Sequence, residues 1–580
     1  MNIRSIRKLL LEINYIVKPD RTKFLFLVFL FFLNSMIEIL GLGLLAQFLN
    51  ILINPSSENK STYISFISDY LEASTNRELA IKLGLLLIGT YFVKMIMSIF
   101  ITLRINHFVN YQVSRLRNFL MTQYLNFPYK LFIKKSSSEY VYSVLELTNK
   151  FSLQVMKNLL KSVSDILVIA LIFGFLILFF GVHLLFIVSL LSIGIIIYFL
   201  VFSKIQVKFG KTINIQSGKI IKFVNESVSG FKELKILNLE VFLLNRLKAS
   251  SDKFAKSSSL AQSITAVPRF LIEFLLVLSI LSLILLSLVF YDDYSQIIAS
   301  IALMGVASIR LLPPLNSLSN TYMVVKLNRD TIERMYKDLN ELEKLRFDSL
   351  RNEKKYQQFE ILEFKNVSFS YLDSDLVLKN VSITIKRGEV VGIVGNSGAG
   401  KSTLMDLMIG LLKPTSGHIY LNGEHVQDVE IFSSKNAVYV PQTPFFIEGT
   451  IAENIALGKE VNDIDQNKMD YALKLSNFSE VLSRLKLSIK DDVGEHGLGL
   501  SGGEKQRLIL ARAIYLDRNL IFLDEPTSAL DKEGEDRVLK ELSSLKMSKT
   551  LIIISHKTEI GDICDKVYSV VNGQIKKVKG

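Results

Sequence analysis

Six long apolar stretches constrain the fold of this chain more than any other feature of its sequence. Each is long enough to supply the roughly 20 residues that an α-helix needs to cross a bilayer. They lie near residues 24–48, 80–103, 160–181, 183–204, 265–290 and 296–322. Hydrophobic residues make up 49% of the 580 residues, and the mean hydropathy is +0.33. We therefore expect a polytopic α-helical membrane domain with six spans.

The distribution of Lys and Arg predicts the orientation of these spans. Basic residues precede the first span and fill the long connections 104–158 and 205–262, whereas the other connections are short or nearly free of them. Because cytoplasmic segments are enriched in Lys and Arg, both termini are expected on the cytoplasmic side of the inner membrane. The segment before residue 24 predicts an amphipathic helix on the cytoplasmic face rather than a cleaved signal peptide.

Two further features exclude classes of site. The net charge of +13 gathers beside the spans, so it indicates cytoplasmic membrane loops and not nucleic-acid binding. Cys564 is the one cysteine of the chain. This excludes an intrachain disulfide and any zinc site built from several cysteines.

The sequence changes character after the last span. Residues 326–358 are charged and predict a helical linker, and from Phe359 onward strands rich in β-branched residues alternate with helices. Such alternation is typical of an α/β domain. We expect a membrane domain over 1–325, a linker over 326–358 and an α/β domain over 359–580.

The first motif of the α/β domain predicts a phosphate-binding loop. GNSGAGKST lies between the strand EVVGIV and the helix TLMDLMIGLL, which is the P-loop pattern in the context that it requires. Backbone N–H groups and the helix N-terminus bind phosphates, Lys401 reaches the β- and γ-phosphates, and Ser402 binds Mg²⁺. The predicted ATP and Mg²⁺ site includes Gly395, Asn396, Ser397, Gly398, Ala399, Gly400, Lys401, Ser402 and Thr403.

A second apolar strand, LIFLDEP, ends in two acids. Asp524 is expected to hold the water shell of Mg²⁺. Glu525 is placed to polarise an attacking water, so it is the candidate general base.

The string LSGGEKQR places Ser501, Gly502 and Gly503 at a predicted helix start, where hydroxyl and backbone donors face an anion. With this string, residues 359–580 resemble the nucleotide-binding domains of ABC transporters, α/β P-loop ATPases in which it is the signature motif. The resemblance implies that the motif closes on ATP held by a second subunit.

The other motifs of that family occur in the family's order. By resemblance, Tyr371 stacks on adenine, Gln442 senses the γ-phosphate and binds Mg²⁺, and His556 hydrogen-bonds the γ-phosphate. Asp531, in SALD, lies in the loop that crosses the dimer seam, and DDVGEHG (491–497) contacts the membrane domain. The chain carries one set of these motifs, which predicts a homodimer or a heterodimer with a related half-transporter.

Six spans that precede the ATPase domain in one chain resemble the exporter class of ABC transporters. The long basic connections carry apolar residues at helical spacing, so the helices are expected to continue into the cytoplasm. They would reverse near Lys135–Tyr142 and Gly230–Asn238. The resemblance implies that these reversals are coupling helices, seated near Gln442 and DDVGEHG.

The spans also carry charges, which are costly in lipid and tend to face a cavity or a partner. They are Glu38, Lys94, Asp165, Arg269, Glu273 and Arg310. Arg269 and Glu273 are four residues apart and alternatively pair with each other, and residues near span ends alternatively reach toward water. Positive charge at Lys94, Arg269 and Arg310 favours an anionic headgroup, because arginine binds phosphate in a bidentate manner.

AVPR in the fifth span and RLLPP in the sixth resemble the PglK family of lipid-linked oligosaccharide flippases. The resemblance implies ATP-driven flipping of a polyisoprenyl-pyrophosphate-linked oligosaccharide, with Arg269 and Arg310 on the pyrophosphate. A further arginine of that family is absent here, where the chain reads NSLSN with Ser317. The alternative is an exporter of another cargo: a lipid A-like lipid, a peptide or a drug.

Overall fold

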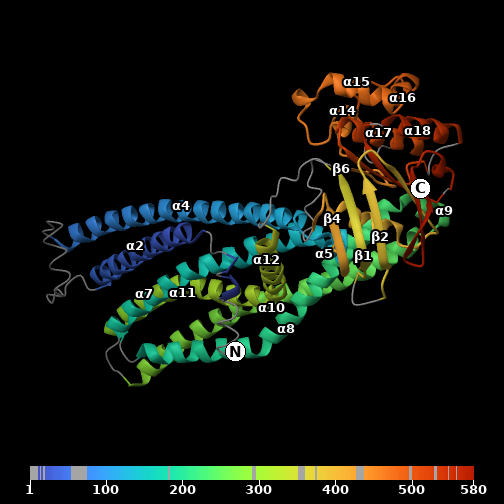
Figure 1. Cartoon of the computed structure of the whole chain (residues 1–580). Coiled ribbons are helices and arrows are strands. Elements are labelled where there is room, and N and C mark those ends of the chain that lie inside the picture. The colour runs from blue at the N-terminus through green and yellow to red at the C-terminus, as the bar shows by residue number, and fades with distance from the viewer. Residues whose placement is uncertain are drawn as a thin grey trace. The chain divides into compact units, whose positions relative to one another are not determined.

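The structure, a computed structural model, consists of two compact units, which are described separately (Figure 1). The first unit contains Met1–Phe127 and Lys135–Asp348, and the second contains Pro128–Lys134 and Ser349–Gly580. The structure describes residues 11–13, 15–16, 20–53, 75–180, 183–290, 295–349, 359–371, 375–425, 437–494, 499–527, 532–546, 548–556 and 558–580.

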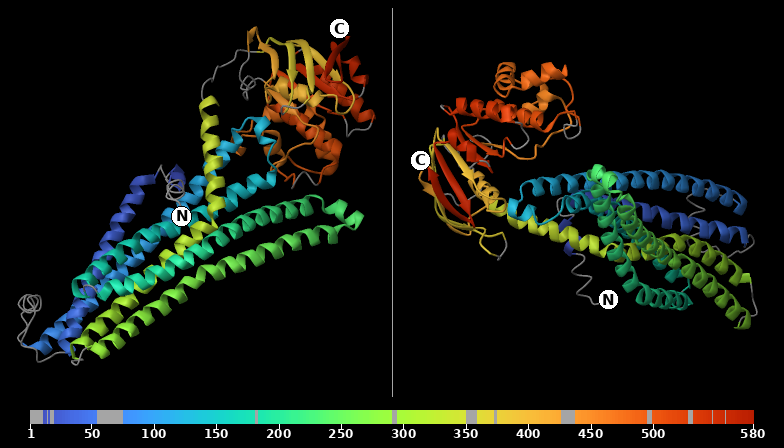
Figure 2. Two further views of the ribbon diagram at one scale, coloured as in Figure 1. Left: turned by 90° about the horizontal axis from the view of Figure 1, so that it is seen from below. Right: turned by 90° about the vertical axis from the view of Figure 1, so that its right-hand side faces the viewer.

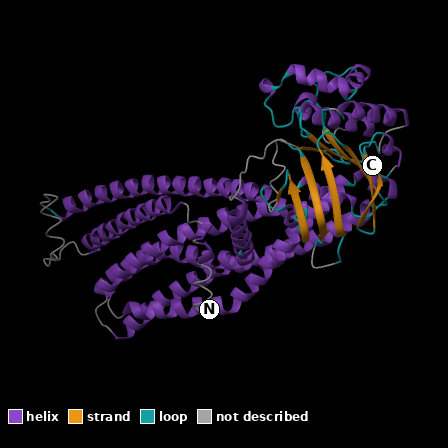
Figure 3. Cartoon of the chain, viewed as in Figure 1, coloured by secondary structure: helices purple, strands orange, loops and turns teal. Residues whose placement is uncertain are grey.

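The first unit is built from helices (Figure 3). In chain order they are α2 (Arg21–Ile53), α4 (Asn76–Leu125), α6 (Ser137–Val141), the π-helices η2 (Tyr142–Leu147) and η3 (Lys150–Met156), α7 (Lys157–Phe180), α8 (His183–Ser229), α9 (Phe231–Leu237), α10 (Glu240–Phe290), α11 (Ser295–Leu327) and α12 (Arg329–Ser349). The long helices α8 and α10 run side by side, as the left view of Figure 2 shows.

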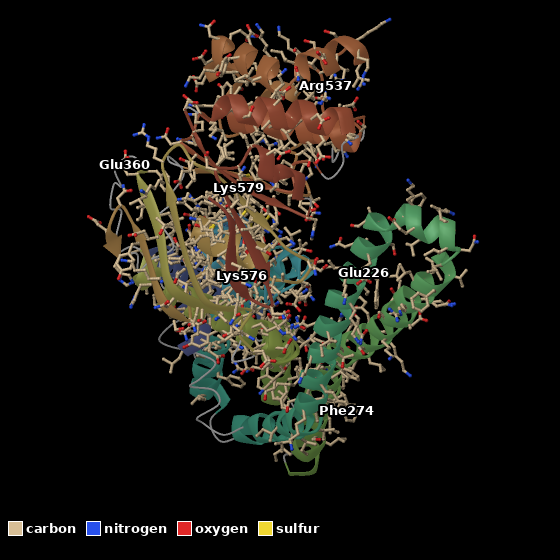
Figure 4. All side chains as sticks on the ribbon, turned by 45° about the vertical axis from the view of Figure 1, so that its right-hand side comes forward. Glu226, Phe274, Glu360, Arg537, Lys576 and Lys579 are labelled. Atoms are coloured by element: carbon tan, nitrogen blue, oxygen red, sulfur yellow. The ribbon has the colours of Figure 1, made fainter. Side chains whose placement is uncertain are left out.

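Hydropathy explains why these helices are long. In the described part of the chain, four segments are long and apolar enough to cross a membrane: Thr22–Leu49, Asn76–Leu125, Ile193–Ser229 and Glu240–Ser279. The third and sixth predicted spans fall on α7 and α11. Apolar side chains such as Phe274 on α10, which is 63% exposed and labelled in Figure 4, suit contact with lipid.

The helices also exceed the thickness of a bilayer. The 50 residues of α4 make a helix of about 75 Å at 1.5 Å per residue, whereas the hydrocarbon core is about 30 Å thick. The predicted extension of the helices beyond the membrane is therefore confirmed for α4.

The first predicted reversal, near Lys135–Tyr142, contains the short helix α6, but the chain leaves α4 earlier than that range. The chain reverses after Leu125, where Pro128 caps the short helix α5 (Tyr129–Phe132), and α6 already begins at Ser137. Proline fixes a backbone angle suited to a helix start, a signal that the apolar run around it obscured. The second reversal lies where it was predicted, because α8 ends at Ser229 and α9 ends at Leu237, followed by Asn238 in a left-handed conformation.

The second unit contains two sheets. A six-stranded sheet has the order β10-β9-β3-β8-β7-β6, with the five strands from β9 to β6 parallel and β10 antiparallel, and a four-stranded antiparallel sheet has the order β2-β1-β4-β5. The strands are β1 (Ile361–Phe369), β2 (Leu378–Lys386), β3 (Val390–Val394), β4 (Ser416–Leu421), β5 (Glu424–His425), β6 (Ala437–Val440), β7 (Leu520–Asp524), β8 (Thr550–Ser555), β9 (Lys566–Val571) and β10 (Gln574–Lys579).

Helices complete this unit: α5, α13 (Lys401–Ile409), α14 (Ile451–Ile455), α15 (Gln466–Leu475), α16 (Phe478–Leu485), α17 (Gly502–Tyr515) and α18 (Lys532–Leu545). The central strands β3, β7 and β8 are buried almost throughout, as parallel strands covered on both faces must be. In their register Val394 pairs with Ser555 and Asp524 with Ile554. The residues that follow these three strands therefore meet at one edge of the sheet.

The short helix α5 belongs to the second unit and packs there beside the end of β1. Lys130 Nζ donates to the carbonyl oxygen of Ser370 at 3.2 Å and lies 5.5 Å from the centre of the Phe369 ring. Tyr129 packs against the core that contains Phe369. Within the second unit α5 thus lies beside the segment that leads to Tyr371.

One buried acid predicts how the stability of the second unit depends on pH. Within the described residues, Glu541 Oε2 on α18 is buried without a hydrogen-bond partner, and burial raises the pKa of Glu541 to about 7. The folded chain then binds more protons than the unfolded chain between about pH 4.5 and 7, so stability falls as pH rises through this range. We expect Glu541→Gln to raise the melting temperature at pH 8 and to have no effect at pH 5.

Thermal unfolding of the full chain at the two pH values measures this effect. The amide keeps an oxygen that accepts the hydrogen bond from Asn477. Glu460→Gln, at an exposed position before the short helix Val461–Asp463, is the control. A gain at pH 8 that persisted unchanged at pH 5 would contradict the assignment.

Candidate functional site

The loop between β3 and α13 encloses the ammonium group of Lys401. Lys401 Nζ donates to the carbonyl oxygens of Gly395 at 2.8 Å and Asn396 at 3.0 Å, and the residue is 6% exposed. Gly400 precedes the helix with φ of 102°, and a Cβ atom there would come within 3.0 Å of Leu378 Cδ2. The tight loop therefore requires glycine and leaves a cation at the N-terminus of α13.

The charge of Lys401 is suited to an anionic ligand. Burial lowers the pKa of Lys401, while the carboxylates of Glu525 and Asp524 oppose that shift. Its nearest partners are the two neutral carbonyl oxygens, with His556 Nδ1 at 3.3 Å, and a charged phosphate oxygen makes a stronger hydrogen bond with an ammonium group. The residues of the loop thus fit the phosphates of a nucleotide.

Asp524 ends β7 beside this loop. Tyr439 Oη donates to Asp524 Oδ2 at 3.1 Å, and burial raises the pKa of Asp524. Burial, with Asp524 nearby, also raises the pKa of Asp406 on α13 to about 6. Tyr439 and Asp406 were not identified from the sequence, because neither lies in a motif.

The residues predicted to hold Mg²⁺ offer hydroxyl, amide and carboxylate oxygens. Ser402 is exposed at the start of α13, Gln442 is exposed after β6, and Asp524 lies at the end of β7. Among the described residues no cluster of three His, Cys, Asp or Glu side chains is arranged for a metal ion. A set of few protein oxygens suits Mg²⁺, which keeps waters and phosphate oxygens as its other ligands.

Glu525 forms the centre of the site. Gln442 Nε2 donates to Glu525 Oε2 at 2.8 Å, and His556 Nε2 lies 2.7 Å from Glu525 Oε1. His556 Nδ1 lies 3.1 Å from the carbonyl oxygen of Gly395. The tertiary structure therefore brings three predicted residues together at the P-loop from the ends of three different strands.

Glu525 is held in an unusual backbone conformation. Its φ is 51°, in the left-handed region that only a few non-glycine residues adopt, and its N–H donates to the carbonyl oxygen of Ile554 at 3.0 Å. Strain of this kind gathers at functional sites. It directs the carboxylate of Glu525 toward Gln442 and His556.

Tyr371 follows β1 and contacts α13. Its hydroxyl lies 3.0 Å from Thr403 Oγ1, and its ring packs edge-on against Phe369 with centroids 5.0 Å apart. The ring is half-buried at the border of the P-loop. This position is compatible with the predicted contact to adenine.

The signature string begins α17. Ser501 caps the helix by accepting from Glu504 N, while the carboxylate of Glu504 accepts from Ser501 N at 2.6 Å. Ser501 and Gly502 are exposed. In the part of the chain that the structure describes, no hydrogen bond joins them to the P-loop. Asp531 and residues 495–498 of the predicted DDVGEHG loop lie outside the described residues.

A buried arginine connects α17 to the segment after Gln442. Arg512 donates to the carbonyl oxygens of Asn454 at 2.7 Å and Phe445 at 3.0 Å. Burial lowers the pKa of its guanidinium to about 10. The helix that presents Ser501 is thereby joined to the segment that presents Gln442.

Three of the predicted membrane charges meet one another. Lys94 Nζ lies 2.6 Å from Glu38 Oε1, and Arg310 Nη1 lies 3.9 Å from the same oxygen. The Arg310 guanidinium also lies 4.9 Å from the centre of the Tyr91 ring. Lys94 and Arg310 therefore already have an acidic partner within the membrane unit.

Arg269 lies elsewhere, in a cavity of about 860 Å³ within the first unit. No ion pair joins it to Glu273 among the described residues, although the sequence spacing allowed one. Lys150 and Lys161 line the same cavity. The structure therefore separates Arg269 from Lys94 and Arg310 and places it with two other cations and one acid, Glu146.

Two of these cations, Lys150 and Lys161, were not predicted from the sequence, although a signal for them was present. Lys150, Gln154, Asn158 and Lys161 recur at intervals of three and four residues, which places a polar stripe on one helical face. The remaining wall is rich in amide and hydroxyl groups from Asn214, Ser217, Ser258, Gln262, Thr265, Asn316, Ser317, Asn320 and Asn328.

Comparisons with known proteins agree with this geometry. Residues 24–310 match the ABC transporter transmembrane region, and residues 378–528 match the ABC transporter family. A probable ABC transporter ATP-binding/permease protein of Haemophilus influenzae is 30% identical over 391 residues, which are 66% of this chain and 69% of that protein. The chain belongs to the ABC transporters.

Other relatives of this ABC transporter carry more specific names. ATP-dependent lipid A-core flippases of Cupriavidus pinatubonensis and Cupriavidus metallidurans are 28% and 29% identical over 362 residues, 61% of the chain. The matched part spans 60% and 59% of those relatives' own length. A bacterial Atm1-family ABC exporter with ATP bound has a similar fold, with a TM-score of 0.76 at 18% identity over 98% of this chain and 96% of that chain.

Proposed function

We propose that two copies of this ABC transporter use ATP hydrolysis to flip an anionic lipid-linked substrate across the inner membrane, with both termini in the cytoplasm. Within that class we propose a polyisoprenyl-pyrophosphate-linked oligosaccharide. The observation that carries the proposal is the cavity in which Lys150, Lys161 and Arg269 face amide and hydroxyl groups.

The ATPase part of the proposal rests on the residues at the end of the parallel strands. Lys401 and the P-loop bind the phosphates, and Tyr371 contacts the adenine. Ser402, Gln442 and Asp524 hold Mg²⁺, which neutralises phosphate charge when bound. Glu525 accepts a proton from the attacking water, and His556 orients Glu525 and contacts the γ-phosphate, in keeping with its 2.7 Å approach.

Two observations support a second copy as the partner. Ser501, Gly502 and Gly503 start α17 and make no hydrogen bond to the P-loop of their own chain in the described part, so they are available to ATP held by another chain. The reversal at α9 exposes Phe231, Ile236 and Leu237 by 63%, 68% and 62%. Such an apolar tip is typical of an interface. A related half-transporter is the alternative partner.

The substrate part of the proposal follows from the chemistry of the cavity. Arginine and lysine bind phosphate oxygens through charge-assisted hydrogen bonds. Amide and hydroxyl groups match the alternating donors and acceptors of a sugar. The lipid tail would remain in the bilayer beside exposed apolar helices. A lipid A-like lipid has the same headgroup chemistry and is the second candidate, because two relatives are named lipid A-core flippases.

Arg269→Ala tests the headgroup assignment. We expect stimulation of ATP hydrolysis by a polyprenyl-diphosphate glycan in proteoliposomes to require about 10- to 100-fold more lipid in the variant, since a charged hydrogen bond contributes about 1.5–3 kcal/mol. Lipid A is assayed in parallel to separate the two candidate substrates. The measurement is the lipid concentration that gives half-maximal stimulation.

Arg310→Ala is the matched control. Because Glu38 and Tyr91 already engage this guanidinium, we expect a smaller shift than for Arg269→Ala. If neither variant altered stimulation or flipping, the cavity would not bind the headgroup. A larger shift for Arg310→Ala would move the phosphate site to the Glu38 cluster.

A further inference from the structure

Asp165 on α7 is a membrane-unit acid that the proposed function has not yet used. The residue is 9% exposed, and its Oδ2 atom has no hydrogen-bond partner within the described structure. The Asp165 carboxylate accepts a hydrogen bond from the Ser317 hydroxyl and lies near the positive charge of Lys161. Both Ser317 and Lys161 line the cavity that contains Arg269. Asp165 therefore lies beside two residues of the cavity wall.

The neighbouring helix α11 also carries a buried oxygen atom without a hydrogen-bond partner in the described part. Asn316 lines the cavity next to Ser317, and its Oδ1 atom is also buried without a hydrogen-bond partner in the described part. Beyond Asp165, α7 packs on α11 through Val168, Ile172 and Leu311. Asp165 Oδ2 and Asn316 Oδ1, both without a hydrogen-bond partner in the described part, thus lie between the apolar contact of α7 with α11 and the cavity.

Unsatisfied buried oxygens are costly, and each needs an explanation. By contrast, Glu38, another acid of this unit, forms an ion pair with Lys94 at 2.6 Å. A carboxylate close to a bound phosphate would repel it, so Asp165 does not serve the phosphate. It lies four residues beyond Lys161, about 6 Å farther along the helix, where it can face a different part of the ligand.

We propose that Asp165, together with Asn316, accepts hydrogen bonds from hydroxyl or N–H groups of the substrate headgroup, while Arg269 and Lys161 hold its phosphates. The cavity then selects a phosphorylated saccharide over a lipid phosphate without a sugar. This inference rests on the proposed function of the same cavity and adds the residues that select the saccharide.

The experiment compares two lipids with the full-length protein in proteoliposomes. One probe is polyprenyl diphosphate, and the other is the same lipid carrying an oligosaccharide. The wild type is expected to respond to the glycan-bearing lipid at lower concentration. Asp165→Asn is expected to need about tenfold more of that lipid for half-maximal ATPase stimulation, with no change for the bare diphosphate, whereas Arg269→Ala weakens the response to both.

Thermal unfolding separates this role from a structural one. If Asp165 stabilises the fold through its interaction with Lys161, Asp165→Asn should lower the melting temperature. If Asp165 interacts only with the substrate, the melting temperature should not change. Asn316→Ala provides a second variant that removes an acceptor without changing charge. It is expected to weaken the response to the glycan-bearing lipid selectively, even if Asp165→Asn fails to fold.

The outcomes are distinguishable. If the wild type responds to both lipids and the variants at Asp165 and Asn316 shift both responses equally or not at all, the inference is overturned and the flippase proposal stands. If the wild type responds to neither lipid, the proposed function fails and the inference fails with it. A selective loss for the glycan-bearing lipid, with the melting temperature maintained, supports it.

Discussion

Glu525→Gln is expected to reduce steady-state ATP hydrolysis by about 10²–10⁴-fold while leaving ATP binding intact, because general-base catalysis contributes that much. The amide retains the shape of the carboxylate and can still contact Gln442, which donates to Glu525 at 2.8 Å, but it cannot accept the proton of the attacking water. Phosphate release by the reconstituted protein measures hydrolysis, and retention of labelled ATP measures binding.

Asp517→Asn is the matched control, because it changes one carboxylate to an amide at an exposed ion pair with Lys549. Surface pairs of this kind contribute little, so hydrolysis should remain at the wild-type rate. Continued hydrolysis by Glu525→Gln at the wild-type rate would refute its role as the base. Loss of ATP binding in that variant would instead indicate that Glu525 supports the P-loop.

Mixing two inactive chains should restore ATP hydrolysis if each site is shared between chains. Lys401→Met removes the phosphate-binding cation, and Gly502→Glu places a negative charge against the γ-phosphate while the helix N-terminus still favours an acid. A mixed dimer has one site in which both defects coincide and one intact site. An equal mixture should therefore recover about a quarter of the wild-type rate, from half the dimers with one intact site each.

A mixture of Lys401→Met with Glu525→Gln is the control, because both residues lie on the same face of the nucleotide. His556 contacts Glu525 at 2.7 Å and lies 3.3 Å from Lys401 Nζ, which places all three within one chain's half of the site. This mixture should show no rescue. Failure of the first mixture, with mixed dimers verified by differential tagging, would contradict the two-chain site.

Motifs whose residues are close together in the chain could be predicted from local sequence alone. The P-loop, LIFLDEP and LSGGEKQR could be placed on strands and helices because an apolar strand, a glycine turn and a helix start lie within a few residues of one another. The membrane helices could be recognised because continuous apolar runs leave a spanning helix few alternatives.

The contacts of the charged residues could not be predicted in this way. Glu38 and Lys94 are 56 positions apart and meet only because α2 packs on α4. Lys150 and Lys161 join Arg269 in one cavity because η3, α7, α8, α10 and α11 line the same space. The partners of these charged residues depend on which helices pack together, and helices far apart in the sequence can be neighbours in the fold.

By itself the sequence determined the six apolar segments, the α/β pattern of the C-terminal domain and the P-loop residues proposed to bind phosphate, because periodicity and short motifs act over one turn or one strand. The tertiary structure alone decided that Gln442 and His556 meet at Glu525, that Lys94 and Arg310 share Glu38, and that Arg269 and Lys161 line one cavity. The reason is physical: parallel strands bring distant loops to one edge, and helix packing selects the partner of each buried charge.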